Sequence, residues 1–347
     1  MQERQIPIRN LYYLLCYAWD QLEQGRVVNV TRHSTSELVD LFALILTDGV
    51  RHLSRRGIER GYEVHRDELS SLRGRIDVFG SIRRNLTLRG RAICEFDELT
   101  VNTLNNQILK GTLRQLFTAP NLDPVLKKEV LNCHRGLTGV ANVSITGSMF
   151  NRIQLHSNTS FYRFLLNVCE LVCSSSFVDS ANGSIKFRDF VRDERAMARL
   201  FERFLFNFIR KEIDGATVKR DRIIWQAESL SDPALFLLPM MNTDISVQRR
   251  GRRLIIDAKY YVNPFNSRWE SEKLHSSNLY QLMSYLANAS FAGDEKLSGM
   301  LIYPKTDREI REKYVIQGHP VYIGTLNLDQ DWQAIHRELQ ELVCWAL

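Results

Sequence analysis

The fold of the C-terminal half is decided by Thr243-Asp244-Ile245 and, after a short turn, by Leu254-Ile255-Ile256-Asp257-Ala258-Lys259-Tyr260-Tyr261. These segments predict two neighbouring strands, 243–248 and 253–259, joined by a turn at Gly251. Asp257 and Lys259 are two residues apart, so their side chains project from the same face of a strand. If the two strands pair through the turn, Asp244 approaches Asp257.

Two carboxylates that converge in this way suit a hard divalent cation, and Mg²⁺ is the natural candidate. We therefore predict Asp244 and Asp257 as metal ligands, with the backbone carbonyl of Ala258 as an additional ligand. Such a metal ion would neutralise charge on a phosphodiester and assist the leaving oxygen. Lys259 would orient the attacking water, stabilise its hydroxide form or contact the phosphate. The alternative is that Asp257 and Lys259 are only polar residues at the end of a buried strand, but the acid on the preceding strand argues against this.

Two further segments contribute candidate residues. Gln281 and Tyr285 are four residues apart and share one face of a predicted helix. They would hold the DNA backbone or bracket Lys259, unless they simply form a half-buried helix face. Glu202 lies on another predicted helix, where its carboxylate would join the metal site or its surroundings, or would form an ion pair with a neighbouring arginine.

The turn between the two strands is rich in arginine. Solvated hairpin tips often have this composition, but a tip beside a nuclease centre would grip phosphates, a role that suits arginine. The predicted DNA-binding candidates are Arg249, Arg250, Arg252 and Arg253.

Helices alternate with strands through the second half, which predicts an α/β fold. The predicted helices there are 159–175, 193–213, 276–289 and one that begins near 329, and the remaining strands are 222–227, 299–303 and 321–325. The first half is predicted to be a mixed α+β domain. Its helices are 10–22, 102–117, 125–135 and a long one from the capping box Ser34-x-x-Glu37 to Arg56, and its short strands, between 61 and 97, include 75–78 and 86–88. We place the domain boundary in the Gly-, Ser- and Asn-rich stretch 138–158, giving domains 1–157 and 158–347.

Charge and cysteine content narrow the class of protein. The net charge is +6, and residues 51–91 alone contain eleven arginines and five acids, which favours contact with DNA or a protein partner in this basic section. The six cysteines contain no C-x-x-C pair, so we expect reduced thiols and a cytoplasmic location. We expect no transmembrane segment. The chain also lacks a G-x-x-x-x-G-K-[ST] motif, so we expect no nucleoside triphosphate bound through a P-loop.

The order of these motifs resembles the PD-(D/E)xK nuclease superfamily, although the first motif reads Thr-Asp instead of Pro-Asp. Blocks along nearly the whole chain are similar to the McrC family, the nuclease subunits of McrBC 5-methylcytosine restriction systems. These blocks are Ile6-Pro7-Ile8-Arg9-Asn10-Leu11-Tyr12-Tyr13, Tyr17-Ala18-Trp19, Leu53-Ser54-Arg55-Arg56-Gly57, Gly74-Arg75-Ile76, Phe96-Asp97-Glu98-Leu99, Asp257-Ala258-Lys259-Tyr260-Tyr261 and Asn278-Leu279-Tyr280-Gln281-Leu282-Met283.

The resemblance implies a restriction-endonuclease-like C-terminal domain, with a mixed central sheet flanked by helices, that cuts DNA with Mg²⁺. It also implies a partner, the hexameric AAA+ ring McrB, which binds GTP and recognises methylated double-stranded DNA. The N-terminal domain would dock into that ring and stimulate GTP hydrolysis. Two alternatives stay open: a non-catalytic adaptor of an AAA+ ring, and a DNA-repair nuclease that does not depend on methylation.

Overall fold

The computed structural model describes residues 6–25, 37–155, 160–178, 185–187, 193–229, 235–261, 265–268, 271–290 and 296–347. The chain forms two compact units, and each is built from separate stretches of sequence. The first, which we call the sheet unit, comprises 1–26, 30–34 and 189–347, and the second, the arm unit, comprises 27–29 and 35–188. Every helix within the described ranges is too short or too polar to cross a lipid bilayer.

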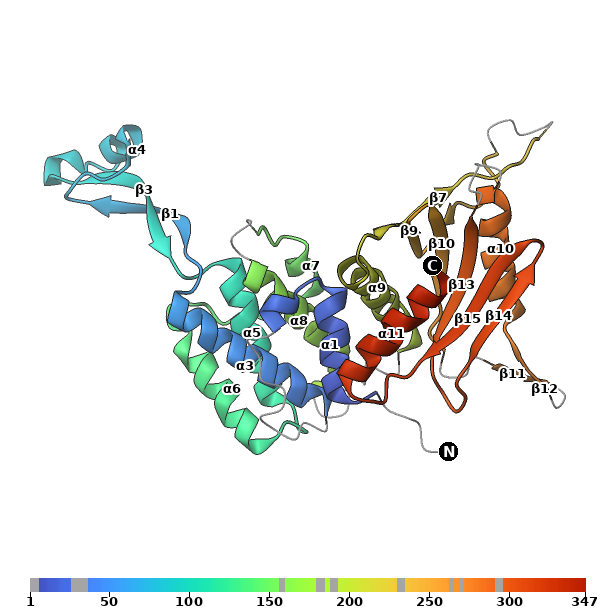
Figure 1. Ribbon diagram of the computed structural model, residues 1–347. Coiled ribbons are helices and arrows are strands. Elements are labelled where there is room, and N and C mark those ends of the chain that lie inside the picture. The colour runs from blue at the N-terminus through green and yellow to red at the C-terminus, as the bar shows by residue number, and fades with distance from the viewer. Residues whose placement is uncertain are drawn as a thin grey trace. The chain divides into compact units, whose positions relative to one another are not determined.

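A six-stranded mixed sheet is the centre of the sheet unit, with the order β14-β15-β13-β10-β9-β6 (Figure 1). The three middle strands, β10 (Arg252–Ala258), β13 (Leu297–Pro304) and β15 (His319–Leu326), run parallel. The flanking strands β6 (Thr217–Lys219), β9 (Ile245–Arg249) and β14 (Arg311–Ile316) pair antiparallel. β13 is buried along its whole length, as expected for a strand covered on both faces. The predicted α/β class is therefore confirmed.

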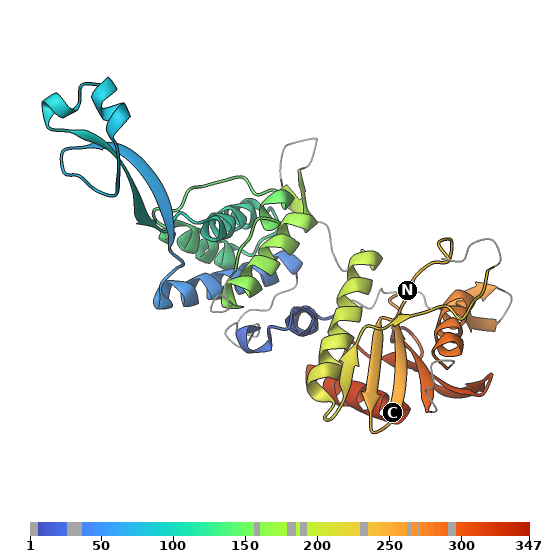
Figure 2. The ribbon, with the colours of Figure 1, turned by 90° about the horizontal axis from the view of Figure 1, so that it is seen from above.

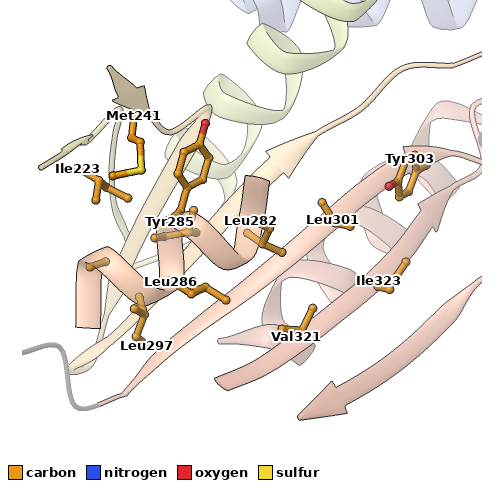
Figure 3. Close-up of a cluster of buried hydrophobic side chains, with 12 residues drawn as sticks. Ile223, Met241, Leu282, Tyr285, Leu286, Leu297, Leu301, Tyr303, Val321 and Ile323 are labelled. Atoms are coloured by element: carbon orange, nitrogen blue, oxygen red, sulfur yellow. The ribbon is translucent and has the colours of Figure 1, made fainter. Parts of the chain in front are cut away.

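Helices cover both faces of this sheet. Side chains alternate along β13, so Leu301 packs beneath α10 (Ser276–Ser290), and Ser298 points to α11 (Trp332–Ala346) on the opposite face. Figure 3 shows the first of these interfaces, in which Leu282 and Leu286 of α10 belong to the same apolar cluster as Leu301. The same alternation along β10 places Ile255, and two residues later Asp257, on the α10 face.

Two further helices complete the sheet unit. α9 (Glu194–Glu212) buries Leu200, Phe201, Phe204 and four further apolar residues at helical spacing. The carboxylate of Asp193 caps its first turn by accepting from the amides of Arg195 and Ala196. α1 (Ile8–Ala18) packs on α9. Asn10 Nδ2 donates to the carbonyls of Leu328 and Gln330 at 2.9 and 2.7 Å. The smaller elements are α2 (Leu22–Gly25), β7 (Arg222–Ile223), β8 (Met241–Asn242), β11 (Phe265–Arg268) and β12 (Ser271–Leu274).

The arm unit combines a helical part with a projecting arm. Its helices are α3 (Leu38–Arg56), α5 (Leu104–Thr118), α6 (Pro124–Gly136), α7 (Gly147–Phe150) and α8 (Ser160–Ser175), followed by β4 (Ser176–Val178) and β5 (Ile185–Phe187). The arm, residues 61–100, contains β1 (Gly61–Leu69), β2 (Arg75–Asp77), α4 (Val78–Arg83), the 3-10 helix η1 (Thr87–Arg89) and β3 (Ala92–Thr100). Both views show it extending away from the helices of this unit (Figures 1 and 2).

The structure divides the chain at different places from the predicted boundary at 157. Helix α8 follows that boundary, yet it packs on α3 and α5 of the arm unit. Helix α1 precedes it, yet it belongs to the sheet unit. Residues 138–155 of the predicted boundary stretch therefore lie within one unit, with helix α7 among them, because the contacts that define the units join segments far apart in the sequence.

Local predictions also need correction. The strand predicted at 86–88 is wrong: this segment is the 3-10 helix η1, between Asn85 and Gly90, which both have positive φ angles of 52° and 65°. The strand predicted at 222–227 ends at Ile223, and the backbone amide of Gln226 donates to Asn288 Oδ1 at 2.8 Å instead of continuing the ladder. The long helix begins at Leu38 after Glu37, which makes no side-chain capping bond, and Ser34 lies outside the described residues.

Candidate active site at the end of the central strand

The three residues predicted as the catalytic centre lie together at the carboxyl end of β10. The last pair of the β9–β10 ladder is Ile256 opposite Ile245, so the next position brings Asp257 opposite Asp244. The strands separate there. The carboxylate of Asp244 accepts a hydrogen bond from the amide of Ala258 at 2.9 Å, which fixes this acid at the point where the backbone ladder stops.

Asp257 is fully buried, and its environment is unusual for a carboxylate. Lys259 Nζ lies 3.0 Å from its Oδ2 atom as an ion pair. Among the described residues, however, neither oxygen of Asp257 accepts a hydrogen bond of normal geometry. Burial raises the pKa of Asp257 to about 6, with the negative charge of Asp244 adding to the increase and Lys259 opposing it. The protein alone therefore does not compensate the charge of the two acids.

Lys259 is held as a cation. Burial lowers its pKa, but the charges of Asp257 and Asp244 outweigh burial, and the net pKa is raised above that of a free lysine. Its ammonium group also donates to Gln281 Oε1 at 3.0 Å. Lys259 is therefore suited to donate hydrogen bonds to a negative group or to water, and not to accept a proton at neutral pH.

Gln281 and Tyr285 extend this contact across helix α10. Gln281 Nε2 donates to the Tyr285 hydroxyl at 2.7 Å, and that hydroxyl donates to the carbonyl of Asn242 at 3.1 Å. Figure 3 shows the Tyr285 hydroxyl pointing away from the apolar cluster around Leu286. A chain of hydrogen bonds therefore runs from Lys259 to the backbone two residues before Asp244. Sequence patterns did not indicate Asn242, because its contribution is a backbone carbonyl.

Glu202 of α9 is near the site but is engaged elsewhere. Its carboxylate pairs with Arg220 at 2.6 Å, which is the ion-pair alternative, although with an arginine eighteen positions away. Burial raises the pKa of Glu202, and the charge of Asp244 raises it further, while Arg220 lowers it. Glu202 thus contributes to the electrostatic field around Asp244.

The arginine turn is not beside the site, and this placement was wrong. β10 runs from the turn to Asp257, five residues beyond Arg252, which is about 17 Å at about 3.3 Å per residue. Arg253 pairs with Asp221 at 2.7 Å and Arg252 donates to the carbonyl of Leu347 at 2.7 Å. Arg249 lies 3.7 Å from the Cys344 sulfur, and Arg250 is exposed at the tip. The β9–β10 hairpin brings Asp244 and Asp257 together at its open end, and the turn lies at the opposite end of the two strands.

The residues present fit a divalent cation. Asp244 and Asp257 supply hard oxygen donors. The Asp257 oxygens are buried away from water and accept no hydrogen bond of normal geometry from the described residues, so a cation could bind them. In an extended strand the N–H and C=O of one residue point the same way, so the Ala258 carbonyl faces the side of Asp244 as its amide does. Within the described ranges no three His, Cys, Asp or Glu side chains converge as a metal site; the donors that this end of β10 could offer are the two carboxylates and this carbonyl.

The sheet order and the flanking helices define a mixed α/β fold, with these three side chains at the end of its central strand. The sequence matches the family described as McrBC 5-methylcytosine restriction system component over residues 2–304. It is 36% identical over 342 residues to the type IV methyl-directed restriction enzyme EcoKMcrBC of Escherichia coli (strain K12), covering 99% of this chain and 98% of that protein. The chain therefore belongs to the McrBC 5-methylcytosine restriction system component family.

One solved structure shows the same fold. The refined half-complex from a tetradecameric assembly of Thermococcus gammatolerans McrB AAA+ hexamers with bound McrC matches with a TM-score of 0.61 and 16% identity, over 97% of this chain and 75% of that chain. The cryo-EM structure of the Thermococcus gammatolerans McrBC complex gives a TM-score of 0.45 and 19% identity, over 59% of this chain and 58% of that chain.

Proposed function

We propose that this chain is the DNA-cutting subunit of a modification-dependent restriction complex and that Asp244, Asp257 and Lys259 form its cutting site. The observation that carries the proposal is the convergence of these three side chains at the end of β10. Asp244 and Asp257, with the Ala258 carbonyl, would hold Mg²⁺. When bound, Mg²⁺ would supply charge neutralisation at the scissile phosphate and at the leaving oxygen.

The residues of the chain divide the remaining work. The Lys259 ammonium, held by Asp257 and Gln281, is placed to donate to a phosphate oxygen or to orient water. Gln281 and Tyr285 restrict its position through their link to Asn242. Restricting a reactive group before the substrate arrives is a general source of rate enhancement. We assign no direct DNA contact to Arg252 or Arg253, because both are engaged within the sheet unit.

We further propose that the arm unit contacts a GTP-hydrolysing AAA+ ring; in the solved half-complex, McrC is bound to McrB AAA+ hexamers. The arm exposes large apolar side chains, as protein-binding surfaces do. The most exposed of these are Tyr62, Phe79 and Leu88, at 78%, 78% and 86%. Seven arginines and seven acids are distributed along residues 61–100. This balance of charge favours a protein partner for the arm more than DNA.

The test is cleavage by the reconstituted complex of this chain and its ring partner, with GTP. We expect Mg²⁺-dependent cutting of 5-methylcytosine DNA by the unaltered chain and none by Asp257→Ala, while GTP hydrolysis is stimulated equally by both. Asp307→Ala, an exposed acid of the same unit, is the matched control and should cut normally. Cutting by pure Asp257→Ala would refute the site. Stimulation without cutting by the unaltered chain would favour an adaptor, and equal cutting of unmethylated DNA would favour a repair nuclease.

A further inference from the structure

A cluster of buried polar groups lies where the arm joins the helices of the arm unit. The chain passes from α3 into β1 through residues 57–60 and returns from β3 to α5 through 101–103. Beyond these junctions, β1, β2, β3 and α4 pack chiefly against one another, and most of β1 is exposed. The direction of the arm therefore depends on what holds its base.

Asn106 joins the two strands of the arm at this base. Its Nδ2 group donates to the carbonyl of Glu59, before β1, at 2.9 Å, and to the carbonyl of Val101, after β3, at 2.8 Å. The side chain of Asn106 is fully buried. One amide group on α5 therefore binds the incoming and the outgoing backbone at once.

Tyr162 of α8 completes the connection. The amide of Glu59 donates to the Tyr162 hydroxyl at 2.7 Å, and this hydroxyl donates to Asn106 Oδ1 at 2.8 Å. Burial raises the pKa of Tyr162 to about 12, so the hydroxyl keeps its proton and remains a donor. Every donor in this chain meets an acceptor, which is the condition under which a buried polar network stabilises one geometry.

The Glu59 carboxylate adds a second connection to α5, at the start of that helix. It accepts from Thr103 Oγ1 at 2.8 Å and from Asn105 Nδ2 at 3.1 Å. Glu59 thus uses its amide, its carbonyl and both carboxylate oxygens to bind α5 and α8. Leaving a buried partner of this kind unsatisfied costs about 1–3 kcal/mol, so the base has one strongly preferred arrangement.

We propose that Glu59, Asn106 and Tyr162 act as a clamp that fixes the direction of the arm, and that they are positioning residues for stimulation of GTP hydrolysis. The second half of this statement rests on the proposed contact between the arm and the AAA+ ring. The nine residues of β1 span about 30 Å at about 3.3 Å per residue, so a rotation of about 10° at the base moves the tip by about 5 Å. A displacement of about 1 Å already impairs a group that must be positioned accurately. A loose base would therefore misplace the tip of the arm even if the surface of the arm were unchanged.

The first experiment measures the arm itself, on the full chain without the ring. Nitroxide labels at Leu88→Cys, in the arm, and Lys128→Cys, on α6, are both at exposed positions, and pulsed electron–electron double resonance gives the distance distribution between them. Cys344→Ser removes the exposed native thiol. We expect a narrow distance distribution for the unaltered clamp and a clearly broader one for Tyr162→Phe, which removes one hydroxyl and keeps the aromatic ring of the side chain.

Two further variants separate the clamp from general loss of stability. Thr112→Val removes a buried hydroxyl of α5 that lies outside the clamp and donates to the carbonyl of Ile108 at 2.8 Å. The distance distribution of this variant should stay narrow. Glu59→Gln keeps the shape of the side chain but replaces one acceptor by a donor, and it should broaden the distribution even if Tyr162→Phe folds poorly. Narrow distributions in both clamp variants would overturn the proposal.

The second experiment adds the ring to unlabelled chains. We expect Tyr162→Phe and Glu59→Gln to lower the maximal stimulation of GTP hydrolysis by about fivefold or more, the lower range of a typical coupling between sites, and Thr112→Val to stimulate normally. Full stimulation by a chain with a broadened arm would overturn the link to the partner. If the unaltered chain fails to stimulate, the proposed docking fails, and the distance distributions still decide whether the clamp exists.

Discussion

The replacement of Asp257 by asparagine should make the metal-free protein more stable above pH 6. Asp257→Asn removes a charge that is fully buried and close to Asp244, and it preserves the shape of the side chain. Because the folded protein raises the pKa of Asp257 from 3.8 to about 6, the folded state binds this proton more tightly than the unfolded chain does. The free energy of unfolding of the unaltered protein therefore falls as pH rises between these two values.

The size of the effect follows from the shift. A difference of about two pKa units at about 1.4 kcal/mol per unit gives about 3 kcal/mol at pH 8. The contribution of Lys259 is already contained in this shift, because its charge lowers the pKa of Asp257. We therefore expect Asp257→Asn to exceed the unaltered protein by up to about 3 kcal/mol in EDTA at pH 8, and the difference to approach zero near pH 4.

Unfolding in denaturant, monitored by tryptophan fluorescence, measures this difference in stability within the sheet unit. All five tryptophans, at positions 19, 225, 269, 332 and 345, belong to the sheet unit. Mg²⁺ should then reduce the difference by about half: at ten times its dissociation constant it adds about 1.4 kcal/mol to the unaltered protein, and it should add little to Asp257→Asn. Asp307→Asn, at an exposed position, is the control and should change nothing.

Two results would contradict this reasoning. If Asp257→Asn were equally or less stable than the unaltered protein at pH 8 in EDTA, the buried carboxylate would not be uncompensated. If Mg²⁺ stabilised both proteins equally, the cation would bind somewhere other than at Asp257.

Three further predictions concern the surroundings of the site. Lys259→Met should lower the rate of DNA cleavage by about 10²–10⁴-fold, the range for loss of one positioned catalytic group, while calorimetry still detects Mg²⁺ binding. Tyr285→Phe removes the hydroxyl that links Gln281 to Asn242 and should lower the cleavage rate with little change in DNA affinity, whereas Tyr280→Phe, at a 70% exposed position of the same helix, should do neither. Gly299→Ala would place a Cβ atom 2.8 Å from Leu286 Cδ1, so unfolding experiments should show a loss of about 1–3 kcal/mol; an unchanged stability would mean that α10 is free to move outward.

The sequence was informative where contacts are local. Asp244, Asp257 and Lys259 were predictable as a group because one hairpin joins their strands and the period of two fixes their common face. The same locality does not hold for the arginine turn. The turn adjoins both strands in sequence, but the length of β10 separates it from Asp257.

The length of the strands in the arm and the limits of the two units could not be predicted for a different reason. β1 and β3 have few buried positions, so neither strand has the alternation of apolar and polar residues that a buried face imposes. The assignment of α1 and α8 depends on contacts such as Asn10 with Leu328, 318 residues apart, and no local pattern encodes a contact of that range. The clamp at Asn106 was equally invisible, because its acceptors are backbone carbonyls.

The separation of β9 from β10 would allow this end of the sheet to bind the cation that we propose. In a continued ladder, Asp244 and Asp257 would be a directly opposed pair of like charges, which destabilises a sheet. Here the Asp244 carboxylate takes the amide hydrogen of Ala258, so one acid is fixed by a hydrogen bond and the other is left without one. Lys259 offsets one of the two negative charges, so Asp244 and Asp257 together retain one uncompensated negative charge. A divalent cation would satisfy both acids at once, and for this reason we expect metal binding and the stability of this part of the fold to be measurably linked.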